Sequence, residues 1–500
     1  MSNLKNDSET IQELIGEVRA LRKEVDQLRT ENERLRAENE RLRTENERLR
    51  TENGQLREEN ATLKARVKDL EEKLNTNSRN SSKSSSQDPY RKRNGNRKPS
   101  DKKQGAQKGH KGHTREMVSP EEVSEFKDIL PDECPHCGGR EFSEDPTAIE
   151  ERQVTELPEI QPEITQFNIH TCTCASCGVA VKAEVPKESL SAFGPRLKSF
   201  ISLITGDLGV TKRKVVSLLG YLNVTISVGS VCNIHHLAGT LLADAYEDIR
   251  NHTLAQSAIH ADETSWYHKG KRRWLWIVTG AESACFKVNL SRSAEAFQSI
   301  IGDLPQPPPL TTDRYSGYNG YEGAHQFCWS HIDRDFEKIF ERGDVDGIIG
   351  LRLKEEADLV FSYWQHFKNG VITRKELQVY IEISVIPPVK ALLQLGSVGQ
   401  ECSSKTHGTC KNLLSRFDCL WTYLYHDNVE PTNNLAERDL RPSVIQRKLS
   451  YGTQSDAGQA FFERMLTVVI TFKKQSRNIF HYLTACFQAY CRDGPIPLPL

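Results

Sequence analysis

The chain has 500 residues, of which 37% are hydrophobic and 27% are charged, and its formal net charge is −1. This length exceeds what one hydrophobic core fills, so we expect several domains, and any nucleic-acid binding must depend on local basic clusters. No apolar N-terminal signal and no run of about 18 apolar residues occurs, so we expect neither secretion nor a membrane span. Thirteen cysteines in such a chain indicate free thiols or metal ligands in a reducing, cytoplasmic compartment.

A heptad repeat occupies residues 9–74. Its d positions carry nine leucines in succession, from Leu14 to Leu70. The a positions read Ile11, Val18, Val25, Asn32, Asn39, Asn46, Asn53, Asn60, Val67 and Leu74. Leucine at d with asparagine at a favours a parallel two-stranded coiled coil, because the amides pair across a dimer seam. The repeat therefore predicts a leucine zipper that makes the protein a homodimer or a higher oligomer.

Residues 75–118 lose this periodicity and are rich in Ser, Asn, Gly, Lys and Arg, including the run RKRNGNRKPSDKK. No core can form from such a composition, so we expect a flexible basic linker. The charge alone does not decide whether this linker lies along DNA phosphates or only keeps the chain in solution.

Two CxxCG motifs mark the next segment, residues 119–190. In each motif two thiolates flank a tight turn and can face one metal ion, and the glycine relieves the turn. The ligands that we expect for a four-thiolate Zn²⁺ site are Cys134, Cys137, Cys174 and Cys177. His170 and Cys172 are rival ligands, and Cys172 in place of Cys174 stays open.

Residues 195–254 show the periodicity of short amphipathic helices, with Gly220 at a helix end and Ser227 at the next helix start. A helix-turn-helix region that binds DNA is one interpretation, and it offers Lys212, Arg213 and Lys214 to phosphates. A purely structural helical bundle is the alternative.

Short strands then follow one another between residues 255 and 337: SAIHAD, WLWIVTG, ACFKVNL, a helix around SRSAEAFQSIIGDL, then PLTTD and HQFCWSH. Three strands, a helix and a further strand ending in an acid is the order of a ribonuclease H-like α/β catalytic domain. Asp262 ends the first strand and Asp313 ends the fourth, so the two carboxylates converge if these strands are neighbours. Carboxylate oxygens are the ligands that Mg²⁺ or Mn²⁺ prefers.

A third carboxylate is expected from a later helix, and Glu437 in NNLAERDLRP is the best candidate, with Asn433 or Asn434 as the helix cap. Residues 338–425 between the two parts are mostly helical by pattern and predict a helical insertion. The catalytic domain would then resume over residues 426–485, and residues 486–500 would form a tail.

With these residues in place, the chain resembles transposases of the insertion sequence 66 family. HADETSW with WLWI, TTDRYSGYNGY with CWSHIDRDF, and NNLAERDLRPSVIQRK with YGTQSDAG resemble its three acidic motifs. Upstream, NSRNSSKSSS, GAQKGHKG and the two CxxCG motifs resemble its linker and zinc-binding region.

The resemblance implies metal-dependent strand cleavage at transposon ends, followed by strand transfer into target DNA. Asp262 would bind both metal ions, and Asp313 and Glu437 would each complete the shell of one. The expected contacts to flanking phosphates are Arg438, Arg441, Arg447 and Lys448. The expected location is the nucleoid of a prokaryotic cell, and accessory transposition proteins are a further class of partner that the resemblance allows.

Several residues have two interpretations. Tyr315, Trp266 and Trp329 would either stack on a distorted base or pack in the core, and the core is preferred. Cys328 and His331 supply only two ligands, so we interpret them as a packed strand end near the metal pocket. Cys402, Cys410 and Cys419 have no ligand spacing and are expected as free thiols.

Two other functions compete with the transposase. A catalytically silent regulator would bind DNA through a zipper, a zinc module and a helix-turn-helix, but it would not need three acidic motifs. A structure-specific nuclease on the same fold would cut DNA without joining it.

Overall fold

A computed structural model of the chain describes residues 3–77, 80–81, 115–142 and 150–500. It divides into two units, Met1–Pro89 and Tyr90–Leu500, which are described separately. Most of the predicted basic linker, including RKRNGNRKPSDKK and GAQKGHKG, lies outside the described residues.

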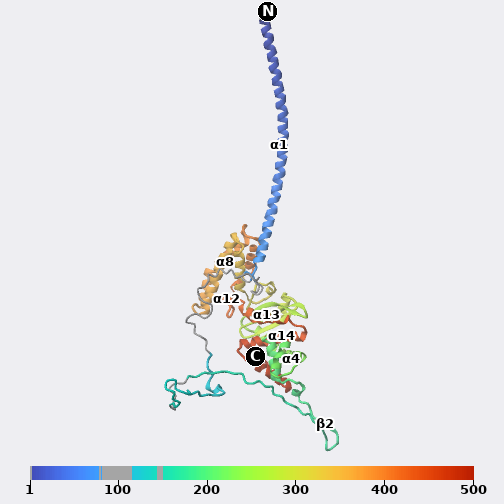
Figure 1. Cartoon of the computed structure of the whole chain (residues 1–500), viewed down its shortest axis with the longest axis vertical. Helices are drawn as coiled ribbons and strands as arrows, with labels where there is room; N and C mark the ends of the chain where they lie inside the picture. Colours follow the sequence, from blue (N-terminus) through green and yellow to red (C-terminus); the bar gives the residue numbers. More distant parts are fainter. Residues whose placement is uncertain (1–2, 78–79, 82–114, 143–149) are drawn as a thin grey trace. The chain divides into compact units, whose positions relative to one another are not determined.

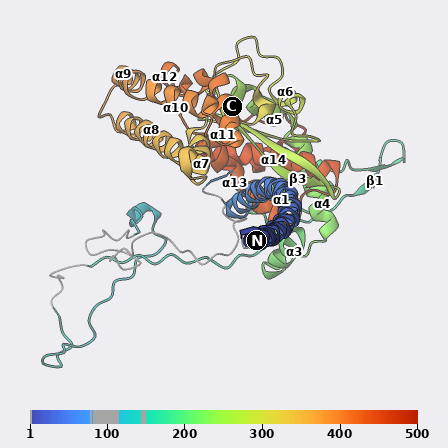
Figure 2. The ribbon, with the colours of Figure 1, turned by 90° about the horizontal axis from the view of Figure 1, so that it is seen from above.

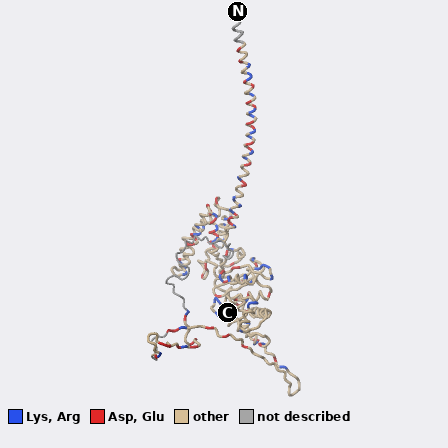
Figure 3. The backbone as a smooth tube through the Cα atoms, in the orientation of Figure 1, with Lys and Arg blue, Asp and Glu red and all other residues tan. Residues whose placement is uncertain are grey.

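The first unit is dominated by one helix, α1 (Asn3–Asn75) (Figure 1). Acidic and basic residues alternate along it (Figure 3). Pairs such as Lys73 Nζ and Asp69 Oδ2, 2.7 Å apart, link successive turns. The nine leucines at d are 46–60% exposed within the chain. The predicted helix is confirmed, whereas its pairing with a second helix stays a prediction.

The second unit contains a five-stranded sheet in the order β5-β4-β3-β6-β7. Its strands are β3 (Ile259–His268), β4 (Lys271–Thr279), β5 (Ala284–Asn289), β6 (Leu310–Thr312) and β7 (His325–Phe327). The strands β3, β4 and β5 pair antiparallel, whereas β6 is parallel to β3 and to β7. Helix α6 (Ala294–Ile301) connects β5 to β6. The first and fourth predicted strands are therefore neighbours, as the convergence of their acids requires.

The last predicted strand, HQFCWSH, is shorter than expected. It ends at Phe327, and helix α7 (Trp329–Phe340) begins two residues later. A short apolar run does not distinguish a strand from the start of a buried helix. His331 therefore lies in the first turn of a helix and not at the end of a strand.

Alternate side chains of the sheet pack into two different cores. On one face, Leu275 and Phe286 pack against helices that precede the sheet in the sequence and against helices that follow it. On the other face, Trp276 and Val278 pack against Phe297 of α6. This period of two fixes which side of β3 each acid faces. Asp262 lies on the same face as Trp266, and Glu263 lies on the opposite face.

The helices of residues 195–254 belong to the first of these cores. They are α2 (Pro195–Gly206), α3 (Lys212–Tyr221), α4 (Val228–Leu241) and α5 (Ala243–Leu254). Ser227 caps α4 as expected, since its hydroxyl accepts the Ser230 N–H at 3.0 Å. Ile201 and Val231 are buried in one cluster with Phe286 of the sheet, so this region is at least a structural support for the sheet.

The predicted insertion is helical throughout most of its length. Its helices are α8 (Asp344–Lys368), α9 (Arg374–Ser384), α10 (Ile386–Val398), α11 (Ser404–Ser415) and α12 (Thr422–Tyr425). Together with α7 they form one group of helices around a separate core (Figure 2). This core includes Leu353, Ile381 and Leu413, so the insertion is stabilised by its own packing.

Within the described residues, one stretch is apolar and long enough to cross a membrane by length and composition, Arg374–Val398. The stretch consists of α9 and α10, and its Ile381 and Leu393 side chains are fully buried in the core of the insertion. A core helix passes the same test, so this stretch is weak evidence for a membrane span.

The last three helices are α13 (Asn434–Ser450), α14 (Asp456–Lys474) and α15 (Ile479–Cys491). A buried ion pair joins the first two, because Lys474 Nζ lies 2.7 Å from Asp439 Oδ2 and both side chains are 9% exposed. Asp439 also accepts the Thr279 hydroxyl of β4 at 2.8 Å. The hydrogen bond holds α13 against the sheet, and the ion pair holds it against α14.

Replacing Lys474 by Met should lower the free energy of unfolding by about 3–5 kcal/mol, because it leaves the Asp439 charge buried without its cation. Urea unfolding can be followed by fluorescence, since all six tryptophans lie between Trp266 and Trp421. The matched control is Arg352→Met, which breaks an ion pair of nearly the same length, 2.8 Å, between side chains that are 64% and 51% exposed. Its effect should stay below about 1 kcal/mol. Equal effects of both variants would show that burial does not strengthen the Lys474 pair.

Candidate acidic site

Two carboxylates meet because β3 and β6 are parallel neighbours. His260 of β3 is paired with Thr311 of β6. Asp262 comes two residues after His260, and Asp313 comes two residues after Thr311. Asp313 directly follows the last residue of β6. Parallel register therefore places these two acids side by side. Asp262 does not end its strand as expected, because β3 continues to His268, whereas Asp313 does follow the end of β6.

Asn433, directly before α13, ties that helix to β3 beside Asp262. Its side chain is buried, and Oδ1 lies 3.1 Å from His260 Nδ1 while Nδ2 donates to the Ala261 carbonyl at 2.8 Å. The expectation that Asn433 or Asn434 caps the helix is therefore half right. Asn433 stands at the cap position, but its amide bonds to the strand and makes no cap hydrogen bond. Asn434 is the first residue of the helix itself.

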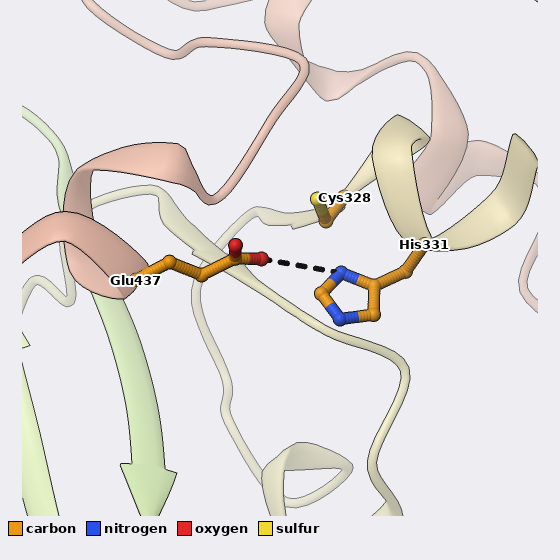
Figure 4. Close-up of side chains that lie close together, drawn as sticks. All are labelled: Cys328, His331 and Glu437. Atoms are coloured by element: carbon orange, nitrogen blue, oxygen red, sulfur yellow. Dashed lines mark ion pairs between the residues drawn. The ribbon is translucent and has the colours of Figure 1, made fainter. Parts of the chain in front are cut away.

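Glu437 lies in the first turn of α13, and its side chain is 40% exposed. Its Oε1 is 3.7 Å from His331 Nδ1 (Figure 4). The same oxygen is 4.0 Å from Arg334 Nη2. Neither Glu437 Oε1 nor His331 Nδ1 has a hydrogen-bond partner, although both atoms are buried. The third predicted acid therefore reaches the region of the first two, with an oxygen that lacks a partner.

The charges of the three acids are poorly compensated. Burial raises the pKa of Asp262 well above its usual range, and the neighbouring Glu263, Asp313 and Glu437 carboxylates raise it further. Burial also raises the pKa of Asp313, against the opposing effect of Arg292. The pKa of Glu437 is raised by burial and by Asp313. Repelling carboxylates that lose hydration together are an arrangement that a bound cation relieves.

A fourth carboxylate, Glu263, lies on the other face of β3. Its side chain is fully buried, forms an ion pair with Arg292 and accepts the Tyr318 hydroxyl. Burial raises its pKa to about 7, with a further contribution from Asp313. Arg292 also lies 3.8 Å from Asp313 Oδ2. Sequence reasoning missed Glu263 and Arg292, although the acid pair in HADETSW was a signal for the first.

The aromatic residues near the acids are mostly structural. Trp266 is 1% exposed and stacks on Phe462 at 4.3 Å, and Trp329 is fully buried. The preferred core interpretation of these two is confirmed. Tyr315 is half-buried, and its ring centroid lies 3.7 Å from the Arg292 guanidinium.

Of the predicted phosphate contacts on α13, Arg438, Arg441 and Lys448 are exposed. Arg447 differs from the expectation, because its Nη1 donates to Thr264 Oγ1 at 3.0 Å and to Ser265 Oγ at 2.7 Å. This guanidinium holds the end of α13 on β3. At the start of α3, Arg213 and Lys214 are exposed, whereas Lys212 donates to Cys232 Sγ at 3.2 Å.

The loop after α13 requires its glycine. Gly452 has a φ of +89°, and a Cβ there would lie 2.0 Å from the Tyr267 carbonyl oxygen. This close approach lets the Thr453 N–H donate to the same carbonyl at 2.9 Å. The glycine in YGTQSDAG thus allows the loop to pair with the far end of β3.

Each CxxCG motif forms the expected turn. The Gly138 N–H donates to the Cys134 carbonyl at 2.9 Å, and the Gly178 N–H donates to the Cys174 carbonyl at 2.8 Å. Both glycines have a positive φ, +73° and +74°. The second turn connects β1 (Thr171–Thr173) to β2 (Ala180–Lys182), which pair antiparallel. Backbone N–H groups of the turns lower the pKa of Cys134 and of Cys174, which favours the thiolate.

In the described part of the chain, these thiols do not gather into one ligand set. The group of three or more potential ligands within 4.8 Å that the structure contains is Cys328, His331 and Glu437. The four-thiolate site of Cys134, Cys137, Cys174 and Cys177 therefore stays a prediction.

If the two turns share a metal ion, these turns should hold about one Zn²⁺ per chain through gel filtration. Replacing Cys134 and Cys137 together by Ser should release it, because two of four ligands are lost. Elemental analysis of the eluted protein measures both values. A wild type without zinc, or a zinc content that the double replacement leaves unchanged, would remove the assignment.

Comparison with known proteins adds a family to this geometry. A model of the family described as "Transposase IS66 family" matches residues 191–460, which include all three acids. A model of a family of unknown function matches residues 7–116.

Two curated relatives come from Sinorhizobium fredii (strain NBRC 101917 / NGR234). The uncharacterized protein y4qI is 22% identical over 257 residues, which are 45% of this chain and 45% of the relative. The uncharacterized protein y4jO is 27% identical over 168 residues, which are 32% of this chain and 47% of the relative. The chain thus spans about half the length of the curated relatives that it matches.

Proposed function

Because the chain belongs to the IS66 family of transposases, we propose that it cuts DNA strands at transposon ends and joins them to target DNA, with Asp262, Asp313 and Glu437 as its catalytic acids. The observation that carries this proposal is the convergence of Asp262 and Asp313 through the register of β3 and β6, with Glu437 beside them on α13. We assign the sheet to the ribonuclease H-like class on its strand order and directions.

Transposases of this family generally use a divalent metal ion. The residues fit such an ion, because three carboxylates have raised pKa values and Glu437 Oε1 is buried without a partner. When bound, Mg²⁺ or Mn²⁺ ions would activate the attacking hydroxyl and stabilise the leaving oxygen.

The three acids would have different roles in metal binding. Asp262 stands centrally and would bind both ions, whereas Asp313 and Glu437 would each bind one. Arg292 and Arg334 lie beside these acids, at positions where a guanidinium can stabilise the charge of a scissile phosphate.

DNA is held elsewhere as well in this proposal. Arg438, Arg441 and Lys448 on α13 and Lys212, Arg213 and Lys214 on α3 would contact phosphates. The zipper would pair two chains, and thereby two DNA ends, and the zinc module would support end recognition. The protein would act in the cytoplasm of a prokaryotic cell, at the nucleoid.

The regulator and the nuclease make different predictions for one experiment. Purified protein is incubated with Mg²⁺, a DNA fragment that ends in the inverted repeats flanking its gene, and a circular target. We expect cuts with a free 3′ hydroxyl at the ends of the repeats, and joined products in the target. Cleavage without joining would favour the nuclease, and specific binding without cleavage would favour the regulator.

A further inference from the structure

Cys328, His331 and Glu437 present three different metal-binding atoms to one point. The sulfur, nitrogen and oxygen atoms all lie within 4.8 Å of one another (Figure 4). Cys328 directly precedes α7, and His331 follows three residues later, so one helical turn places both on the same side. Glu437 comes from α13, which follows the insertion in the sequence.

Two features distinguish this group from an ordinary polar cluster. The buried His331 Nδ1 and Glu437 Oε1 atoms have no hydrogen-bond partner, yet they lie 3.7 Å apart. Ligand atoms around a tetrahedral Zn²⁺ ion with bonds of about 2.0–2.3 Å are separated by roughly 3.3–3.8 Å. An ion between the two atoms would satisfy both.

We propose that Cys328, His331 and Glu437 form a binding site for a transition-metal ion of the Zn²⁺ class. A thiolate and an imidazole select such an ion over Mg²⁺, which prefers oxygen ligands. On binding, the Cys328 thiol releases its proton to solvent, and Arg334 moves away from Glu437. The Asn433 N–H, which donates to Cys328 Sγ at 3.1 Å, keeps the sulfur in place.

Occupation of this site has a consequence for catalysis, and that consequence rests on the proposed function. A Glu437 carboxylate that binds the Zn²⁺-class ion cannot also bind a catalytic ion together with Asp262 and Asp313. Zn²⁺ therefore inhibits cleavage that depends on Mg²⁺. The three residues thus make the acidic site sensitive to which metal ion is available.

Binding is tested without DNA by adding Co²⁺ to the full-length protein and recording its thiolate-to-cobalt absorption band. Because the predicted CxxCG site would also bind cobalt, the informative quantity is the difference between the wild type and Cys328→Ser. We expect Cys328→Ser to lose part of the band, and His331→Gln and Glu437→Gln to weaken cobalt binding at this site by at least about 10-fold. Cys410→Ser, which removes a buried thiol of the insertion core, should match the wild type.

Excess Zn²⁺ should displace this cobalt, whereas excess Mg²⁺ should not. Spectra of Cys328→Ser and His331→Gln that equal the wild-type spectrum would overturn the proposal, provided that circular dichroism shows both variants folded. Because no DNA is present, a protein that binds cobalt here but never cuts DNA would refute the proposed function and leave the metal site standing.

Discussion

Asp313→Asn and Glu437→Gln should each slow strand cleavage in Mg²⁺ by roughly 10³-fold or more. Both replacements keep the size of the side chain but remove the negative charge that a hard cation needs. The two acids come from different parts of the fold, Asp313 directly after β6 and Glu437 on α13, so equal losses would mean that one site needs both. Single-turnover cleavage of a labelled transposon end measures the rates.

The matched control for these variants is Glu355→Gln, an exposed acid on α8 that pairs with Arg352. It removes the same charge from the same chain and should leave the rate within about twofold, because surface pairs contribute little. Full cleavage by either triad variant would mean that its carboxylate does not hold a catalytic ion.

Removing residues 1–74 should convert the protein from a dimer or higher oligomer to a smaller species. The nine leucines at d are about half exposed in the single chain, and burying the exposed half of each leucine in a seam contributes roughly 1 kcal/mol. Light scattering should therefore show a loss of mass larger than that of the deleted segment. A truncated protein that keeps its oligomeric state would show that another surface assembles it.

A finer version of this experiment keeps the helix intact. Leu35, Leu42 and Leu49, which lie at d, are replaced together by Ala, and a control replaces Arg36, Arg43 and Arg50, which follow them directly, by Ala. Alanine preserves helix formation in both cases. Only the leucine variant should dissociate, because only its side chains lie in the predicted seam.

The pairing of Asp262 with Asp313 could be predicted because it depends on a local signal. Each acid follows a short segment with a strand pattern, SAIHA or PLTT, and an intervening helix implies a parallel neighbour. The α1 helix was predictable for the same reason, since its repeat of seven is visible along the chain. In both cases the pattern lies within a few residues of the feature that it predicts.

The role of Asn433 could not be predicted from its neighbourhood. Asparagine before a helix normally caps it, and the competing partner, His260, is 173 residues away in the sequence. Arg447 was misjudged for the same reason, because Thr264 and Ser265 are distant in sequence and occupy its guanidinium.

The Cys328 and His331 pair was set aside because two ligands do not make a metal site. The third ligand, Glu437, comes from α13, which follows the insertion in the sequence, and only the packing of α7 near α13 reveals it. The phosphate contacts of the exposed arginines and lysines stay predictions, because exposure is necessary for such contacts but does not identify the partner.

The central claim is that the three acids hold the divalent ions on which cleavage depends, whereas DNA binding depends on other parts of the chain. The most direct test measures both activities of the wild type and of Asp262→Asn on the same labelled transposon end. We expect Asp262→Asn to bind the end with unchanged affinity and to show no cleavage in Mg²⁺ or Mn²⁺. A wild type that binds its own ends specifically, yet cuts them no faster than Asp262→Asn in either metal, would contradict the claim.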